Sequence, residues 1–91
     1  MKNLPDNVVL YKTTPEFNQD TLPDGVQNNH QTAAGTWGHI VVHEGSLRYV
    51  IESPEKEEHV LIPGKPGIVE PQCLHHIEII GLVRFSVEFY H

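Results

Sequence analysis

Strict alternation of apolar and polar side chains near the end of the chain constrains the fold most. Between positions 82 and 90, every second residue is a valine or a phenylalanine, namely Val83, Phe85, Val87 and Phe89. Successive side chains of a β-strand point to opposite faces, so this segment predicts a strand with one face buried in a core. Residues 46–52 alternate in the same way, and no segment carries an apolar stripe of helical period and length. The sequence therefore predicts an all-β fold.

Short runs of strand-forming residues, separated by turn formers, fill the rest of the chain. We expect strands over residues 8–13, 26–32, 37–43, 46–52, 59–62, 68–69, 74–80 and 82–90. Glu44-Gly45 predicts a tight hairpin, and Gly81 predicts a short connection before the last strand. This punctuation is typical of an antiparallel meander closed into a small barrel or sandwich, and we expect one domain over residues 1–91.

Composition limits the classes of function. Lys plus Arg number 6 against 12 Asp plus Glu, a formal net charge of −6, which argues against a nucleic-acid groove because phosphates require a basic surface. No export signal and no apolar segment long enough to span a membrane is expected. The single cysteine, Cys73, cannot form an internal disulfide, so we expect a cytoplasmic protein. An exposed edge strand would favour a homodimer.

The predicted strand 74–80 carries an imidazole on an apolar face. Alternation puts His75 on the same face as Ile77 and Ile79. If that face points inward, His75 is a neutral imidazole facing the core, with one ring nitrogen available as a ligand. A small β-barrel with this arrangement could hold a metal or a polar ligand at its centre.

The predicted strand 26–32 is polar on both faces, which core packing alone does not explain. Asn28, His30 and Thr32 share one of these faces. If the face points into the barrel, the cavity is hydrophilic; if it points outward, the segment is a solvated edge. Trp37, at the start of the next strand, is interpreted as a core or cavity-mouth residue, with stacking on a ligand as the alternative.

Two segments together resemble a known family. Residues 30–49 read H-x-T-x-x-G-T-W-G-x-I-x-V-x-x-G-x-L-x-Y, residues 66–75 read P-G-I-V-E-P-Q-x-x-H, and residues 83–90 read V-x-F-x-V-E-F-Y. The combination resembles the cupin-like domain that precedes the methyltransferase in some tellurite-resistance (TehB) proteins and that also occurs as a small stand-alone bacterial protein. The resemblance covers the chain from about Tyr11 onward.

The resemblance implies a cupin-like double-stranded β-helix, which is a small antiparallel barrel or jelly roll. His30 falls on the first histidine of the cupin H-x-H pair, and His75 falls on the histidine of the second block. The sequence departs from the pattern at Thr32, which replaces the second histidine, and near Gly38, where a glutamate is usual. The chain also lacks the methyltransferase part, so no S-adenosylmethionine chemistry is expected of it.

A divalent transition metal held by His30 and His75 would need further ligands. Glu78 or Glu88, with water, could complete the shell, and imidazole suits Zn, Fe, Ni or Cu. Alternation places Glu78 on the face opposite His75 unless a bulge intervenes. In the competing interpretation the two histidines are hydrogen-bonded groups of a pocket that recognises a small polar or anionic ligand, with Asn28, Thr32 and Trp37 as further pocket residues.

The leading prediction is that the chain binds a small molecule or a divalent metal inside the barrel. A link to tellurite or other oxyanion stress follows from the resemblance alone. One alternative is a metal-dependent oxygenase or isomerase that uses His30 and His75. Another is a non-catalytic assembly domain. Cys73 is a weak candidate for a redox role, because no second cysteine accompanies it, and the other histidines are expected to be surface or satisfied groups.

Overall fold

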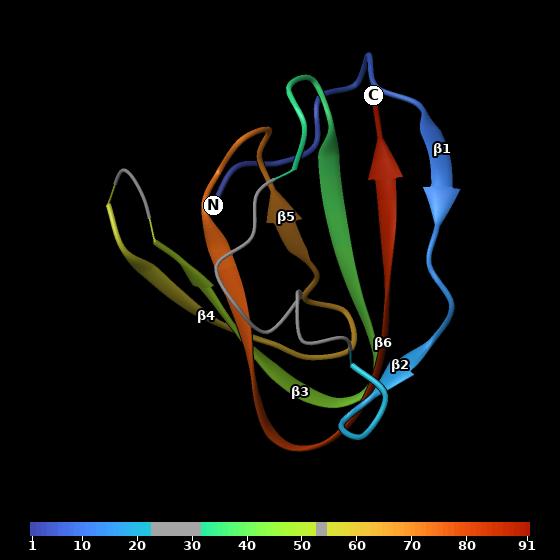
Figure 1. Cartoon of the computed structure of the whole chain (residues 1–91), viewed down its shortest axis with the longest axis vertical. Helices are drawn as coiled ribbons and strands as arrows, with labels where there is room; N and C mark the ends of the chain where they lie inside the picture. Colours follow the sequence, from blue (N-terminus) through green and yellow to red (C-terminus); the bar gives the residue numbers. More distant parts are fainter. Residues whose placement is uncertain (23–31, 53–54) are drawn as a thin grey trace.

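The part of the chain that the structure describes contains six antiparallel strands and the segments that connect them. The computed structural model describes residues 1–22, 32–52 and 55–91, and it contains no helix within them. The strands are β1 (Leu10–Thr13), β2 (Phe17–Asn18), β3 (Trp37–Ile51), β4 (Glu57–Leu61), β5 (Gly67–Val69) and β6 (His75–Tyr90). The all-β prediction is confirmed, and the curled sheet is consistent with a small cupin-like barrel (Figure 1). Because no described segment is helical, none of them forms a helix that could cross a membrane.

The long strands β3 and β6 form a ribbon that supports the rest of the fold. They pair antiparallel over their whole length, from Trp37 opposite Tyr90 to Ile51 opposite His75. Both strands bend sharply near the bottom of the view in Figure 1. Each strand therefore contributes to both ends of the barrel.

The bend corrects the hairpin predicted at Glu44-Gly45, because β3 continues through these residues. Gly45 has a φ of 79°, and the β3–β6 register slips on either side of it. A β-carbon at Gly45 would overlap the carbonyl oxygen of Leu82 on β6. The glycine thus serves a bulge where two bent strands approach closely, rather than a turn between neighbouring strands.

The connection predicted at Gly81 is also absent from the structure, because β6 runs on through this residue. On β6, the residues paired with β3 change from Val83 directly to Ile79, so the three β6 residues between them fall outside the regular pairing. Two of these, Ile80 and Leu82, are 46% and 77% exposed. The strand order β1-β6-β3-β4 shows that the sheet is not the sequential meander that was expected.

The short strands close the barrel around the two halves of the ribbon. β5 pairs with the first half of β3, and β4 pairs with its second half. β1 and β2 pair with the second half of β6. β2 was not expected, and it places Phe17 beside Phe85 with ring centroids 5.7 Å apart. The predicted strand 26–32 lies outside the described residues except for Thr32.

The core lies inside the barrel and follows the alternation of the sequence. Leu47, Tyr49 and Phe85 are fully buried and the residues next to them are more exposed, except Val50 and Ser86, which are 1% and 8% exposed. The Tyr49 hydroxyl donates a hydrogen bond of 3.0 Å to the carbonyl oxygen of Ile68 on β5. Burial raises the pKa of Tyr49 far above its ordinary value, with smaller contributions from Cys73, Glu70 and Glu57. This buried hydrogen bond ties the centre of the ribbon to the barrel wall.

Candidate functional site

A cavity of about 90 Å³ lies inside the barrel at the end where β3, β5 and β6 converge. Its walls are mostly aliphatic and aromatic side chains, with one imidazole and two hydroxyls among the described residues. The described lining consists of Thr14, Phe17, Thr32, Gly38, Ile40, Val69, His75, Ile77, Val87 and Phe89. Native cores contain few voids larger than a water molecule, so a space of this size is a candidate binding site.

His75 is the one titratable side chain among the described lining residues. It is only 4% exposed, and its Nδ1 atom donates a hydrogen bond of 2.9 Å to the carbonyl oxygen of Cys73. Its ring meets the ring of Tyr49 edge-on, with centroids 5.7 Å apart and planes at 75°. Since a carbonyl oxygen only accepts, the proton lies on Nδ1, and in the neutral ring Nε2 is the acceptor or ligand atom.

A tight turn between β5 and β6 holds Thr32 at the cavity wall. The turn spans Glu70 to Cys73, with the Cys73 amide donating to the Glu70 carbonyl oxygen at 3.2 Å. Gln72 adopts a φ of 59°, and its amide donates to the carbonyl oxygen and hydroxyl of Thr32 at 3.2 and 3.3 Å. The Thr32 hydroxyl donates in turn to the Glu70 carbonyl oxygen at 3.2 Å. The backbone of the turn therefore orients the hydroxyl of Thr32.

The second hydroxyl of the cavity is engaged in the same way. Thr14 donates from its hydroxyl to the carbonyl oxygen of Pro15 and accepts from the amide of Val87, both at 2.9 Å. These contacts fasten the segment between β1 and β2 to β6. Both hydroxyl groups at the cavity wall thus donate hydrogen bonds to backbone carbonyl oxygens.

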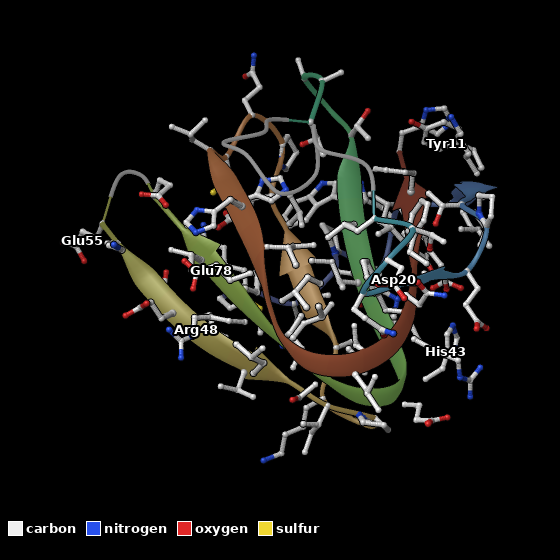
Figure 2. The ribbon with its side chains drawn as sticks, turned by 60° about the horizontal axis from the view of Figure 1, so that its bottom comes forward. Tyr11, Asp20, His43, Arg48, Glu55 and Glu78 are labelled. Atoms are coloured by element: carbon white, nitrogen blue, oxygen red, sulfur yellow. The ribbon has the colours of Figure 1, made fainter. Side chains whose placement is uncertain are left out.

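The structure brings only His75 of the four predicted metal ligands to the cavity, within the residues that it describes. Glu78 projects from the outer side of the ribbon beside Arg48 (Figure 2). Its carboxylate contacts His76 Nε2 at 2.8 Å and Arg48 at 3.5 Å. Strand alternation explains this placement, since positions 75 and 78 face opposite ways.

Glu88 is separated from His75 for the same reason. It lies opposite His39 on the outer face of the β3–β6 ribbon, and its carboxylate contacts His39 Nδ1 at 2.8 Å. The Tyr90 hydroxyl donates to the same oxygen at 3.2 Å. His30 and Asn28 lie outside the described residues. Within the described ranges, no group of three His, Cys, Asp or Glu side chains is arranged to hold a metal ion.

Of the predicted pocket residues, Thr32 lines the cavity and Trp37 is not among the described lining residues. Gly38, the next residue on β3, lines the cavity instead, because it is the first residue of this strand that faces inward. A β-carbon at Gly38 would lie 3.1 Å from Cβ of Val69, which shows how closely β5 approaches. Sequence reasoning missed Thr14, Phe17 and Val69, whereas the strict alternation of residues 83–89 already pointed Val87 and Phe89 inward.

The other histidines make polar or ring contacts outside the cavity, as expected. His43 contacts the Ser86 hydroxyl at 2.9 Å, His59 contacts Glu57 at 3.0 Å, and His91 stacks on Tyr11. His76 also lies 2.6 Å from Glu52 through its buried Nδ1 atom. The two groups are not aligned for a hydrogen bond, since Nδ1 has no hydrogen-bond partner among the described residues.

Cys73 is half-buried and is the last residue of the turn that begins at Glu70. Burial raises the pKa of its thiol, and Glu70 and Glu57 raise it further. A raised pKa keeps the thiol protonated near neutral pH, which lowers its reactivity as a nucleophile. The geometry thus gives Cys73 a positioning role, through its carbonyl oxygen, toward His75.

Comparison with known proteins identifies similar chains. Residues 12–87 match the model of the TehB-like domain. The chain is 33% identical over 85 residues to the probable S-adenosyl-L-methionine-dependent methyltransferase TehB of Haemophilus influenzae strain Rd, covering 89% of this chain and 29% of that protein. It is 26% identical over 99 aligned positions to the uncharacterized protein YeaR of Escherichia coli K12, covering 99% of this chain and 83% of YeaR.

Two crystal structures share the fold. A structural-genomics protein from E. coli K12 superposes with a TM-score of 0.90 at 22% identity, covering 100% of this chain and 97% of that one. TehB from H. influenzae superposes with a TM-score of 0.84 at 31% identity, covering 93% of this chain and 32% of TehB. This chain therefore spans less than a third of the length of TehB.

Proposed function

Because the chain belongs to the TehB-like domain family, we propose that it is a binding module that takes a small molecule into the cavity beside His75. The part of TehB that it matches is 29% of that protein, so the proposal concerns this domain and not methyl transfer. As expected from the family resemblance, we place this binding step in the response to tellurite or related oxyanions.

The single observation that carries the proposal is a buried imidazole on the wall of an otherwise apolar space. The cavity of about 90 Å³ has apolar walls that include Ile40, Val69 and Ile77, and such walls favour uptake of apolar groups. His75 is 4% exposed and places a polar group on that wall. A domain of this size has little stability in reserve, so a ligand that binds only the folded state would stabilise it measurably.

Ligand binding is tested by the methyl NMR spectrum and the melting temperature of the protein during a screen of small molecules. A true ligand raises the melting temperature with concentration and shifts the methyl signals of Ile40, Val69 and Ile77. His75→Phe should abolish the effect, while His43→Phe, at an exposed histidine, should retain it. Shifts confined to surface methyl groups would contradict the proposal and favour an assembly domain.

The metal-binding and enzymatic alternatives depend on His30 in addition to His75. The described residues supply one ligand, so they do not by themselves fit a transition-metal site. Elemental analysis of tag-free protein decides the question. Near-stoichiometric metal that disappears in both His30→Ala and His75→Ala would support a metal-binding cupin, and oxygen consumption by that form would support an oxygenase.

We also propose a cytoplasmic homodimer joined along a sheet edge. The path of the sheet ends at β1 on one side and at β4 on the other. Edge strands offer unpaired backbone groups, and Val60 on β4 is 56% exposed. Sedimentation of wild-type protein and of Val60→Lys tests this arrangement. A dimer that survives the lysine, or a monomer at all concentrations, would contradict assembly through β4.

A further inference from the structure

We infer that the ligand of the cavity is an uncharged, mostly apolar molecule, and that a free oxyanion is not bound there. This inference rests on the proposed binding function and names the chemical class of the ligand. It carries a consequence for the link to oxyanion stress: any such role of this domain would involve a neutral compound.

No permanent positive charge faces the cavity. The chain has six Lys and Arg residues, none of them within 23–31 or 53–54, so the structure describes all six. None of the six lines the cavity. Three of them contact carboxylates elsewhere: Lys2 with Glu70 at 3.5 Å, Arg48 with Glu78 at 3.5 Å, and Arg84 with Glu16 at 3.0 Å. An oxyanion entering the barrel would therefore lose its hydration without meeting a fixed counter-charge.

The neutral donors of the described wall are also engaged. The hydroxyl protons of Thr14 and Thr32 go to the carbonyl oxygens of Pro15 and Glu70. The backbone amides of Val87 and Gln72 donate to those same two hydroxyl groups. Anion sites in proteins use converging donors of these kinds, and here they are bonded to one another.

The Nδ1 proton of His75 is likewise engaged by the backbone. It is held by the carbonyl oxygen of Cys73 at 2.9 Å. In the neutral ring the other nitrogen, Nε2, is an acceptor and offers no proton to an anion. The formal charge of the whole chain is −6, which further disfavours the approach of an anion.

The size of the space sets the size of the ligand. A cavity of 150 Å³ in another protein holds benzene, with its six carbon atoms. By proportion, a cavity of about 90 Å³ encloses about four non-hydrogen atoms, so a short-chain alcohol or a compound of similar bulk fits. A larger ligand would extend through the mouth of the cavity.

The experiment compares matched neutral and anionic probes at pH 8 by methyl NMR of the full chain. The probes are xenon, isobutanol, its anionic counterpart isobutyrate, and tellurite. We expect saturable shifts of the Ile40, Val69, Ile77 and Val87 methyl groups with xenon and isobutanol, and none with the two anions. Val69→Ile, which narrows the cavity, should weaken isobutanol binding about tenfold, while Val60→Ile on the exposed face of β4 should not change it.

Each other outcome has a defined meaning. Saturable shifts of the cavity methyl groups by isobutyrate or tellurite, at an affinity equal to or above that of isobutanol, would overturn the neutral-ligand inference and leave the binding function standing. Exclusion of all four probes from a folded protein would overturn the binding function as well. Equal weakening by Val69→Ile and Val60→Ile would place the neutral probes outside the cavity and would also overturn the inference.

Discussion

The Nδ1 atom of His75 donates a 2.9 Å hydrogen bond to the carbonyl oxygen of Cys73, two residues earlier in the chain. The bond fixes the tautomer of a buried imidazole and anchors the start of β6 against the turn. His75 therefore contributes to stability as well as to the cavity.

Replacing His75 with alanine is expected to destabilise the fold by about 2 to 3 kcal/mol. The change removes a buried ring, its edge contact with Tyr49 and the hydrogen bond to Cys73. Urea denaturation measures the loss. His43→Ala, at an exposed histidine bonded to Ser86, should cost under about 1 kcal/mol. Equal losses in the two variants would contradict a structural role for the buried imidazole.

Gly45 and Gly35 form a matched pair for testing the bend of the ribbon. Both have positive φ values, 79° and 77°, so alanine meets the same backbone strain at either position, about 1 kcal/mol. At Gly45 the added carbon would overlap the carbonyl oxygen of Leu82, whereas at Gly35 no atom of the described residues lies within 4 Å of it. Gly45→Ala should therefore cost about 3 kcal/mol or more and Gly35→Ala about 1 kcal/mol in urea denaturation. Similar values would show that the bend tolerates a side chain.

The raised pKa of Tyr49 predicts a loss of stability in alkaline solution. The unfolded chain releases the phenolic proton near pH 10, while burial keeps the folded tyrosine protonated. Above that pH the unfolded state binds fewer protons, so the free energy of unfolding falls as pH rises, by up to about 1.4 kcal/mol per pH unit. Tyr49→Phe should cost about 1 kcal/mol at pH 8 and flatten the decline between pH 9 and 11. Tyr11→Phe, at an exposed tyrosine, serves as the control.

The contact between His76 and Glu78 predicts an altered titration of one exposed carboxyl group. The hydrogen bond from His76 lowers the pKa of Glu78, with smaller effects of the charges on His76, Arg48 and Lys56. The stabilisation is present above the ordinary value of 4.5 and is lost as pH falls through the lowered pKa. His76→Gln should raise the pKa of Glu78 toward 4.5, as measured by carbon NMR of the carboxyl group. His59→Gln should leave it unchanged, and a shift in that variant would contradict the local origin.

Local pattern was sufficient to predict the fold class and the inward face of residues 82–90. Alternation put Phe85 on a core face, and it put His75 and Glu78 on opposite faces of one strand before any pairing was known. It could not predict which strands pair, because a glycine with positive φ suits both a hairpin and a bulge. The continuous ribbon of β3 and β6 depends on contacts between residues far apart in sequence, and these leave no local signal.

The same limit explains what was missed at the candidate site. Thr14, Phe17 and Val69 line the cavity because β1, β2 and β5 fold across the ribbon, a relationship that no spacing in the chain reveals. The resemblance drew attention to Thr32 and His75, which do share the cavity. Glu88 was a candidate ligand by residue type alone, and its place on the outer face follows from its pairing with β3.

The pairing of β3 with β6 has a consequence during synthesis of the chain. Trp37 and its partner Tyr90 are far apart in sequence, so β3 is synthesised before its principal neighbour β6. Such distant contacts slow folding, because the chain loses the entropy of closing a large loop before the strand pairing can stabilise it. Until β6 is made, the apolar face of β3 lacks its principal partner, which is the kind of surface that favours aggregation of a folding chain.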